Sequence, residues 1–133
     1  IGALLSISIL SCGQENATKH ENTTSEEHGT QRHERVDKET FLSFVQEHPD
    51  AQIVDVRTPG EFSNGFIPSA VNIDFNGSDF KGQIDKLDKS KPVLIYCQAG
   101  GRSAKALDMM SNMNFSTVLE LEGGYGNYIS PNN

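Results

Sequence analysis

Residues 91–106 read KPVLIYCQAGGRSAKA, and this stretch decides the fold. The four residues at 93–96 form a continuous apolar run, which predicts a strand buried on both faces. Residues 103–113 carry apolar side chains at helical spacing and predict a helix with one buried side. The segment between them contains two glycines, which predicts a tight loop. A strand, a loop and a helix in this order are typical of a parallel α/β sheet.

The rest of the chain repeats this alternation. Short runs rich in β-branched residues predict three more buried strands, at 52–56, 70–73 and 118–121. Helical patterns occur at 38–47, where we expect Asp37 to cap the helix, and at 79–87. Because strands alternate with helices, the predicted fold class is α/β, with right-handed crossovers between parallel strands.

The composition fits one soluble domain. The chain has 133 residues, of which 35% are hydrophobic and 22% charged, and its net charge is -7. A nucleic-acid partner is not expected, because neutralising phosphates takes a surplus of Lys and Arg. The 4 His and 2 Cys show no metal-ligand spacing, so no metal is predicted.

The N-terminal residues suggest a lipid anchor. Residues 1–11 are apolar or small, which suits the core of a signal peptide whose beginning is missing, and they are too few to span a bilayer. The following ILSCG at 9–13 resembles a bacterial lipobox, so we expect Cys12 to be lipidated and the protein to lie in the bacterial cell envelope, in the periplasm or at the outer membrane. The alternative is a disordered apolar N-terminus with an incidental cysteine.

Residues 12–33 change to a polar composition and are interpreted as a disordered tether. Its histidines, His20, His28 and His33, are expected to be solvated. A disulfide between Cys12 and Cys97 is disfavoured, because it would remove the free thiolate that the loop after residue 96 is expected to hold.

The loop that begins at Cys97 carries the chemistry. Gly100 and Gly101 permit unusual backbone angles, so that successive N–H groups can turn inward and form a nest for an anion. Ser103 is expected to open a helix whose N-terminus points into the loop, and Arg102 adds a positive charge. These features predict a lowered pKa and a reactive, exposed Cys97 thiolate. The alternative is an inert cysteine at a strand end.

Loop length separates two kinds of protein that share this design. Cys97 and Arg102 are separated by four residues. Cysteine phosphatases have five, and their wider loop encircles phosphate or arsenate. The shorter ring resembles the loop of the rhodaneses, which cradles a persulfide sulfur. Three further segments resemble rhodanese motifs in the family order: DVRTPGEF at 55–62, GFIPSAVNI at 65–73 and LEGGY at 121–125.

This resemblance implies a single rhodanese domain at residues 34–133, with an open parallel sheet of about five strands flanked by helices on both faces. It implies a sulfurtransferase without a cofactor, in which Cys97 takes a sulfane sulfur from thiosulfate or a persulfide and passes it to a thiol or cyanide. The loop residues expected to hold the persulfide are Gln98, Ala99, Gly100, Gly101, Arg102 and Ser103.

The chain departs from the family at three positions, with Gln98 where Arg is common, Phe66 for His and Tyr128 for Trp. Gln98 removes a positive charge beside the nucleophile, which weakens the case for thiosulfate, a dianion. Asp55 and Arg57 either border the pocket or, as we favour, serve the structure, with Asp55 bonding loop N–H groups and Arg57 pairing with Glu61.

Two other functions stay open. The first is a non-catalytic rhodanese module that binds a partner or senses redox state, and the second is a phosphatase or arsenate reductase, which the short loop disfavours. The expected partners are a small sulfur donor and acceptor and, through the lipid anchor alone, a membrane. We expect a monomer.

Overall fold

The computed structural model describes residue 2 and residues 29–131. Its five strands form one sheet in the order β1-β5-β4-β2-β3, and all neighbouring strands are parallel. The strands are β1 (Arg32–Val36), β2 (Gln52–Asp55), β3 (Val71–Asn72), β4 (Val93–Tyr96) and β5 (Thr117–Leu121). The predicted parallel α/β sheet of about five strands is therefore confirmed.

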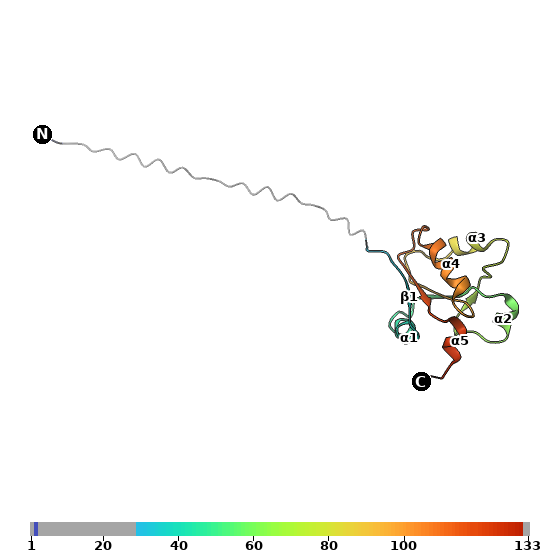
Figure 1. The fold of residues 1–133 in the computed structure, drawn as a ribbon. Coiled ribbons are helices and arrows are strands. Elements are labelled where there is room, and N and C mark those ends of the chain that lie inside the picture. The colour runs from blue at the N-terminus through green and yellow to red at the C-terminus, as the bar shows by residue number, and fades with distance from the viewer. Residues whose placement is uncertain (1, 3–28, 132–133) are drawn as a thin grey trace.

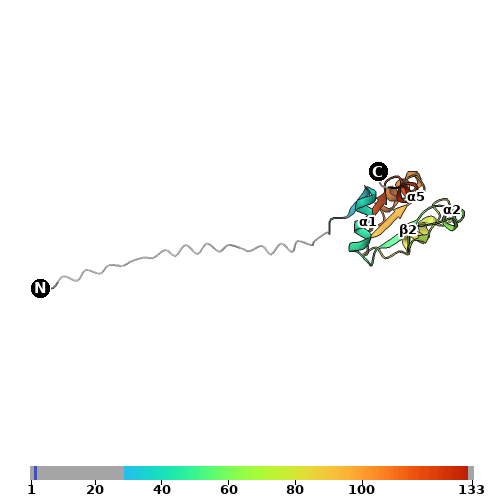
Figure 2. The same cartoon turned by 90° about the horizontal axis from the view of Figure 1, so that it is seen from below.

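Helices cover both faces of this sheet, as predicted. They are α1 (Lys38–Glu47), α2 (Pro59–Ser63), α3 (Phe80–Asp85), α4 (Gly101–Met110) and α5 (Gly124–Ile129). Figure 1 shows α3 and α4 on one side of the sheet and α1 and α5 on the other. The view from below in Figure 2 looks onto the side that α1 and α5 cover.

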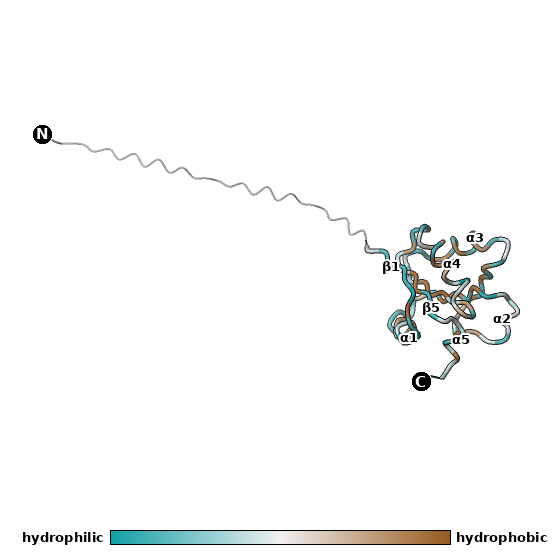
Figure 3. Tube along the Cα trace, in the orientation of Figure 1, coloured by the Kyte–Doolittle hydropathy of each residue, from teal (hydrophilic) through white to brown (hydrophobic). Residues whose placement is uncertain are grey.

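The central strand β4 is buried on both faces. Val93 and Ile95 belong to the apolar cluster under α3 and α4, whereas Leu94 and Tyr96 belong to the cluster on the opposite face. All four residues are 0% exposed. Alternate side chains of a strand point to opposite faces, so the continuous apolar run is what a doubly covered strand requires. Figure 3 shows hydrophobic residues concentrated along the central strands.

Side-chain caps fix the starts of two helices. The Asp37 carboxylate accepts a hydrogen bond from the Thr40 N–H (2.8 Å), which confirms the predicted cap of α1. Helix α2 begins with a capping box, in which Thr58 and Glu61 each bond the backbone of the other. The box fixes Glu61 in the first turn of α2, which follows the carboxyl end of β2 at the same edge of the sheet where Cys97 follows β4.

Strand β1 was not predicted from the sequence. It pairs with β5 from Arg32 to Val36, so the folded part begins two residues before the expected boundary at 34. Of its five residues only Val36 is buried, because an edge strand gains its stability from main-chain pairing rather than from an apolar side-chain pattern. His33, expected to be solvated in the tether, donates from Nε2 to the Phe115 carbonyl oxygen (2.7 Å).

The predictions for the N-terminal residues fall almost entirely on 1–28. Cys12, the signal-peptide remnant, His20, His28 and most of the tether lie outside the residues that the structure describes. Within the described part of the chain, no helix combines the length and apolar character that crossing a bilayer takes.

Candidate active site

Cys97 directly follows β4 and is a free thiol. The Gly100 N–H donates to its Sγ (3.1 Å), and the Ser103 Oγ lies 3.3 Å from the same sulfur. Helix α4 begins at Gly101, two residues earlier than predicted, because Gly100 adopts the left-handed conformation of a helix cap. Ser103 is therefore in the first turn of α4, from which its hydroxyl faces the sulfur.

These donors set the acidity of the thiol. Burial by itself would raise the pKa of Cys97, but hydrogen bonds from the Ser103 hydroxyl and from the N–H groups of Ser103, Gly100 and Ala99 outweigh it. The pKa of Cys97 therefore lies below its ordinary value. This direction agrees with the sequence prediction, and the largest effects that lower the pKa come from uncharged hydrogen-bond donors.

The predicted exposure of the thiol is wrong. Cys97 is 1% exposed, and Gly100 and Ser103 on either side of the sulfur are buried as well. Gln98, Ala99 and Gly101 are exposed, so the outer surface of the loop faces solvent while its inner surface holds the sulfur. A donor molecule can reach Sγ only after the loop or a neighbouring side chain moves.

The two glycines of the loop are not equivalent. Gly100 has φ 102°, in the region that L residues rarely adopt. Gly101 does not have a positive φ, and the space where its Cβ would lie is open. The sequence assigned the same role to both. The structure requires glycine at position 100 and not at 101.

We expect Gly100→Ala to lower the free energy of unfolding by about 1–3 kcal/mol, because a side chain strains this backbone angle. The change also turns the Gly100 N–H away from the sulfur, so the pKa of Cys97 rises. Gly101→Ala is the matched control and changes neither quantity. Urea unfolding and the pH dependence of iodoacetamide alkylation measure both effects. Equal behaviour of the two variants would contradict the assigned geometry.

Arg102 is paired with a carboxylate. Its Nη1 and Nη2 donate to the two oxygens of Glu61 at 2.6 and 2.9 Å. Hydrogen bonding from Arg102 lowers the pKa of Glu61 to about 2, against the opposing effect of burial. The positive charge that the sequence placed beside Cys97 is thus neutralised by α2. The ion pair ties the first turn of α4 to α2.

The predicted pairing of Arg57 with Glu61 is wrong. Arg57 instead pairs with Asp55, its Nη2 lying 2.6 Å from Oδ2, and the two side chains are 2% and 0% exposed. The Arg57 backbone N–H also donates to Asp55 Oδ1 (2.9 Å), as expected for a carboxylate that serves loop N–H groups. The remaining Arg57 donors reach the Gly65 carbonyl oxygen (2.6 Å) and Gln98 Oε1 (3.1 Å). Arg57 therefore connects the end of β2 to the loop that begins at Cys97.

Comparison with known proteins decides the family. A model of the Rhodanese-like domain matches residues 39–130. The chain belongs to the rhodanese-like domain family.

Two curated relatives are named as sulfurtransferases. The rhodanese-like domain is 30% identical to a sulfurtransferase of Allochromatium vinosum over 89 residues, which are 67% of this chain and 81% of that protein. It is 31% identical to the thiosulfate sulfurtransferase GlpE of Shewanella oneidensis over 84 residues, which are 63% of this chain and 81% of that protein.

A solved structure shares the fold. The rhodanese-like domain protein of Staphylococcus aureus superposes with a TM-score of 0.63 at 26% identity, over 71% of this chain and 90% of that one. These matches establish the rhodanese-like fold and a sulfurtransferase family.

The ion pair between Arg102 and Glu61 predicts how the stability of the rhodanese-like domain changes in acid. Because the folded pKa of Glu61 is about 2, below its ordinary value of 4.5, the pair contributes stability that is fully present above pH 4.5 and lost as pH falls toward 2. We expect wild type to have a larger free energy of unfolding than Glu61→Gln at neutral pH, and this difference to shrink as the pH falls from 4.5 toward 2. Urea unfolding across the acid range measures it. A difference that does not change with pH would contradict the ion pair.

Two elements that support the site were not recognised from the sequence. Gly124 packs against the loop, and the N–H groups of Tyr125 and Gly126 donate to the carbonyl oxygens of Cys97 (2.7 Å) and Gln98 (3.0 Å). The sequence showed the glycine pair but assigned it only a turn. Glu120, 0% exposed, accepts from Ser103 Oγ at 2.5 Å, and nothing in a strand pattern pointed to it.

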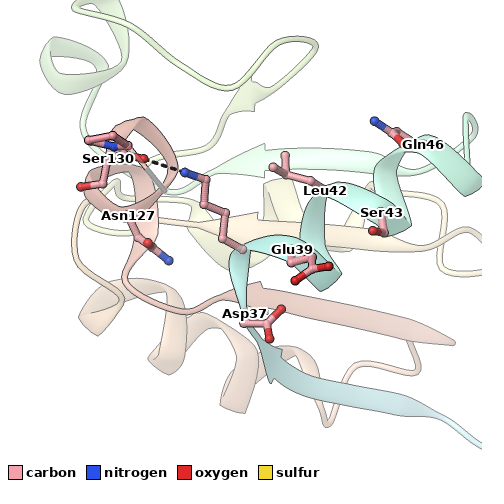
Figure 4. Close-up of a pocket in the computed structure, with 9 residues that line it drawn as sticks. Asp37, Glu39, Leu42, Ser43, Gln46, Asn127 and Ser130 are labelled. Atoms are coloured by element: carbon pink, nitrogen blue, oxygen red, sulfur yellow. Dashed lines mark hydrogen bonds between the residues drawn. The ribbon is translucent and has the colours of Figure 1, made fainter. Parts of the chain in front are cut away.

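A hollow of about 860 Å³ lies away from this site, between α1 and α5 (Figure 4). Lys38 is one of the residues that line it and donates from Nζ to the Ser130 carbonyl oxygen (2.7 Å). Its lining does not include Cys97 or the loop residues 98–103. The chemistry of the rhodanese-like domain is therefore assigned to the loop and not to this hollow.

Proposed function

We propose that the domain is a sulfurtransferase that moves a sulfane sulfur from thiosulfate or a persulfide to a thiol or cyanide, through a persulfide on Cys97. One observation carries the proposal. The Cys97 sulfur lies inside a ring of donors from Gly100 and Ser103, which lower its pKa and so favour the attacking thiolate. Membership of a family with relatives named as sulfurtransferases supports it.

The transfer takes two steps. The Cys97 thiolate attacks the outer sulfur of the donor, the new S–S bond forms, and the old bond breaks with its electron pair leaving on sulfite or on the donor thiolate. An acceptor thiolate or cyanide then attacks the outer sulfur of the Cys97 persulfide and releases the Cys97 thiolate. Each step is a displacement at sulfur, so no external oxidant or reductant is consumed. Splitting the reaction in this way is ordinary covalent catalysis.

The loop favours sulfur over phosphate. Only Gln98, Ala99, Gly100 and Gly101 separate Cys97 from Arg102, and both terminal nitrogens of that arginine are bound to Glu61. A phosphatase loop needs its arginine free to hold two oxygens of the tetrahedral anion. The pairing of Arg102 with Glu61 therefore argues against a phosphatase or arsenate reductase.

The charge on the outer surface of the loop indicates which sulfur donor fits the site. Gln98 brings no charge and accepts a hydrogen bond from Arg57, so the outer surface of the loop lacks the extra cation that would attract a dianion. A persulfide donor, with at most one charge on its sulfur, fits this surface better than thiosulfate does.

One observation favours a non-catalytic module instead, namely the 1% exposure of Cys97. A thiol that never opens to solvent can still hold the loop together and shape a surface for a partner. Turnover distinguishes the two functions, because the module gives none with any donor.

For the N-terminal residues we propose that Cys12 carries a lipid that anchors a monomeric domain in the bacterial cell envelope, at the outer membrane or in the periplasm. This rests on the sequence ILSCG at 9–13 alone. Incorporation of labelled palmitate that is lost in Cys12→Ala would support it, and unchanged incorporation would reject it.

Steady-state transfer tests the main proposal. Purified protein is given thiosulfate or glutathione persulfide as donor, with cyanide as acceptor, and thiocyanate is measured. We expect turnover with glutathione persulfide above that with thiosulfate, and none in Cys97→Ser, which serves as the blank. Equal rates for wild type and the blank with both donors would reject the function.

A further inference from the structure

Three arginines contact or belong to the loop that begins at Cys97, and each of them is neutralised by a carboxylate. The pairs, each joined by a contact of 2.6 Å, are Arg57 with Asp55, Arg35 with Glu120, and Arg102 with Glu61. A sulfur donor brings negative charge to this loop. The choice of donor therefore depends on whether an anion can reach any of these cations.

The three pairs differ in how far solvent reaches the carboxylate. Asp55 and Glu120 are each 0% exposed, so a dissolved anion cannot take their places without displacing buried groups. The side chains of Glu61 and Arg102 are 32% and 26% exposed. The Arg102 pair is thus the one of the three in which an anion can compete for the guanidinium. The charge of Cys97 acts on Arg102, so the guanidinium is also within electrostatic range of the reacting sulfur.

Glu61 is held by its own helix as well as by Arg102. Its Oε1 accepts hydrogen bonds from the N–H (3.3 Å) and the hydroxyl (3.1 Å) of Thr58 in the capping box. The Arg102 Nη1 and Nη2 donate to Oε1 and Oε2 at 2.6 and 2.9 Å. This two-oxygen geometry is the one in which arginine also binds tetrahedral oxyanions. An incoming oxyanion must therefore displace a carboxylate that α2 holds in place and that repels it.

We propose that Glu61 sets the donor preference of the domain, because it occupies Arg102 and so disfavours donors that leave as an oxyanion, such as thiosulfate. Glu61 acts through Arg102 and is therefore a positioning residue. A persulfide that leaves as a simple thiolate has no pair of oxygens to place against Arg102, so its use does not depend on Glu61. The inference rests on the proposed function in taking Cys97 as the group that attacks the donor.

The test compares two donors, thiosulfate and the persulfide of 2-mercaptoethanol, with cyanide as the acceptor. Glu61→Gln keeps the residue type that a capping box requires and removes the charge that neutralises Arg102. We expect kcat/KM for thiosulfate to rise about tenfold or more relative to that for the persulfide, mainly through a lower KM, because Arg102 becomes free to bind the oxyanion. A merely structural role of Glu61 would change both donors alike.

Two variants examine whether the effect acts through Arg102. Asp74→Asn removes a carboxylate whose charge acts on Arg102 from a distance, and asparagine can still accept the Asn76 N–H that Asp74 Oδ1 accepts (2.9 Å). We expect its donor preference to stay near that of wild type. Glu61→Gln combined with Arg102→Met removes the guanidinium and should lose the gain. Glu61→Met gives a second reading if Glu61→Gln folds poorly.

Binding of sulfate gives a readout that needs no sulfur transfer. Sulfate is a tetrahedral dianion that donates no sulfur, and when bound to Arg102 it should slow the alkylation of Cys97 by iodoacetamide, measured on the peptide that contains Cys97. We expect sulfate to protect Glu61→Gln at a concentration about tenfold lower than it protects wild type. Sodium chloride at equal ionic strength is the reference, because it screens charge without offering the oxygens.

Three results would overturn the proposal. They are an unchanged donor preference in both Glu61→Gln and Glu61→Met, an equal rise in Asp74→Asn, and a gain that survives the removal of Arg102. The two readouts separate this inference from the proposed function. Turnover with both donors at an unchanged ratio rejects the role of Glu61 alone. Sulfate protection that changes as expected, without turnover of either donor, supports the hold of Glu61 on Arg102 and rejects the function alone.

Discussion

Replacing Asp55 with alanine is expected to lower the free energy of unfolding by about 3–5 kcal/mol. The reason is the position of Arg57, which is 2% exposed and has Asp55 as its only carboxylate partner among the described residues. Burial alone would lower the pKa of Arg57, and its bonds to Asp55 raise it above the ordinary arginine value. Without Asp55 a charged guanidinium stays buried and unpaired. Urea unfolding at neutral pH measures the loss.

A second change identifies the cause. Arg57→Met in the Asp55→Ala chain removes the unpaired charge, so we expect the double variant to be more stable than Asp55→Ala alone. Asp85→Ala is the control, because Asp85 pairs with Lys89 on the surface at 2.6 Å and its loss should have little effect. A loss below about 1 kcal/mol in Asp55→Ala would contradict a buried ion pair, since removing one partner costs about 3–5 kcal/mol.

Gly124→Ala is expected to damage both the fold and the loop around Cys97. A Cβ at this position would lie 2.3 Å from the Cys97 carbonyl oxygen and 2.7 Å from the Gln98 carbonyl carbon. Gly124 also has φ 60°, so alanine would cost about 1–2 kcal/mol in the left-handed conformation and about 1–3 kcal/mol more in overpacking. The backbone of the loop cannot move aside without losing its hydrogen bonds from Tyr125 and Gly126.

The displaced loop should also lower sulfur transfer by about 100-fold, as a small misplacement of a reacting group does in other enzymes. Unfolding in urea and turnover with glutathione persulfide measure the two effects. Gly60→Ala is the control, because the nearest atom to its Cβ would be the Thr58 Oγ1 at 4.0 Å, an ordinary contact. Unchanged turnover in Gly124→Ala would show that the segment after β5 does not hold the loop in place.

The elements that the sequence predicted are those with a side-chain pattern. Strand β4 was recognised because burial on both faces leaves a continuous apolar run. Helix α4 was recognised because burial on one face leaves a periodic apolar pattern. Strand β1 was missed because only Val36 of its residues is buried. Its place in the sheet depends on backbone pairing with β5, whose paired residues lie 85 positions further along the chain, and local patterns do not record such pairing.

The same distinction applies to the candidate site. The loop from Cys97 to Ser103 is continuous in sequence, so its glycines, serine and arginine indicated an anion site. The partners of those loop residues come from elsewhere in the chain. The sequence analysis paired Glu61 with Arg57, because the two are four positions apart. The structure instead pairs Glu61 with Arg102, because the capping box at the start of α2 turns that carboxylate toward α4. Burial of Cys97 likewise depends on residues that no local pattern relates to it.

The most direct test is the mass of the peptide that contains Cys97 after the purified protein has been incubated with glutathione persulfide and, separately, with thiosulfate. A persulfide held in the loop predicts a gain of about one sulfur mass on Cys97, which is lost when cyanide is added. Alkylation of Cys97 after unfolding shows that the thiol was free to react. No added mass with either donor, on protein whose Cys97 is then fully alkylated, would contradict the claim that this loop carries sulfur.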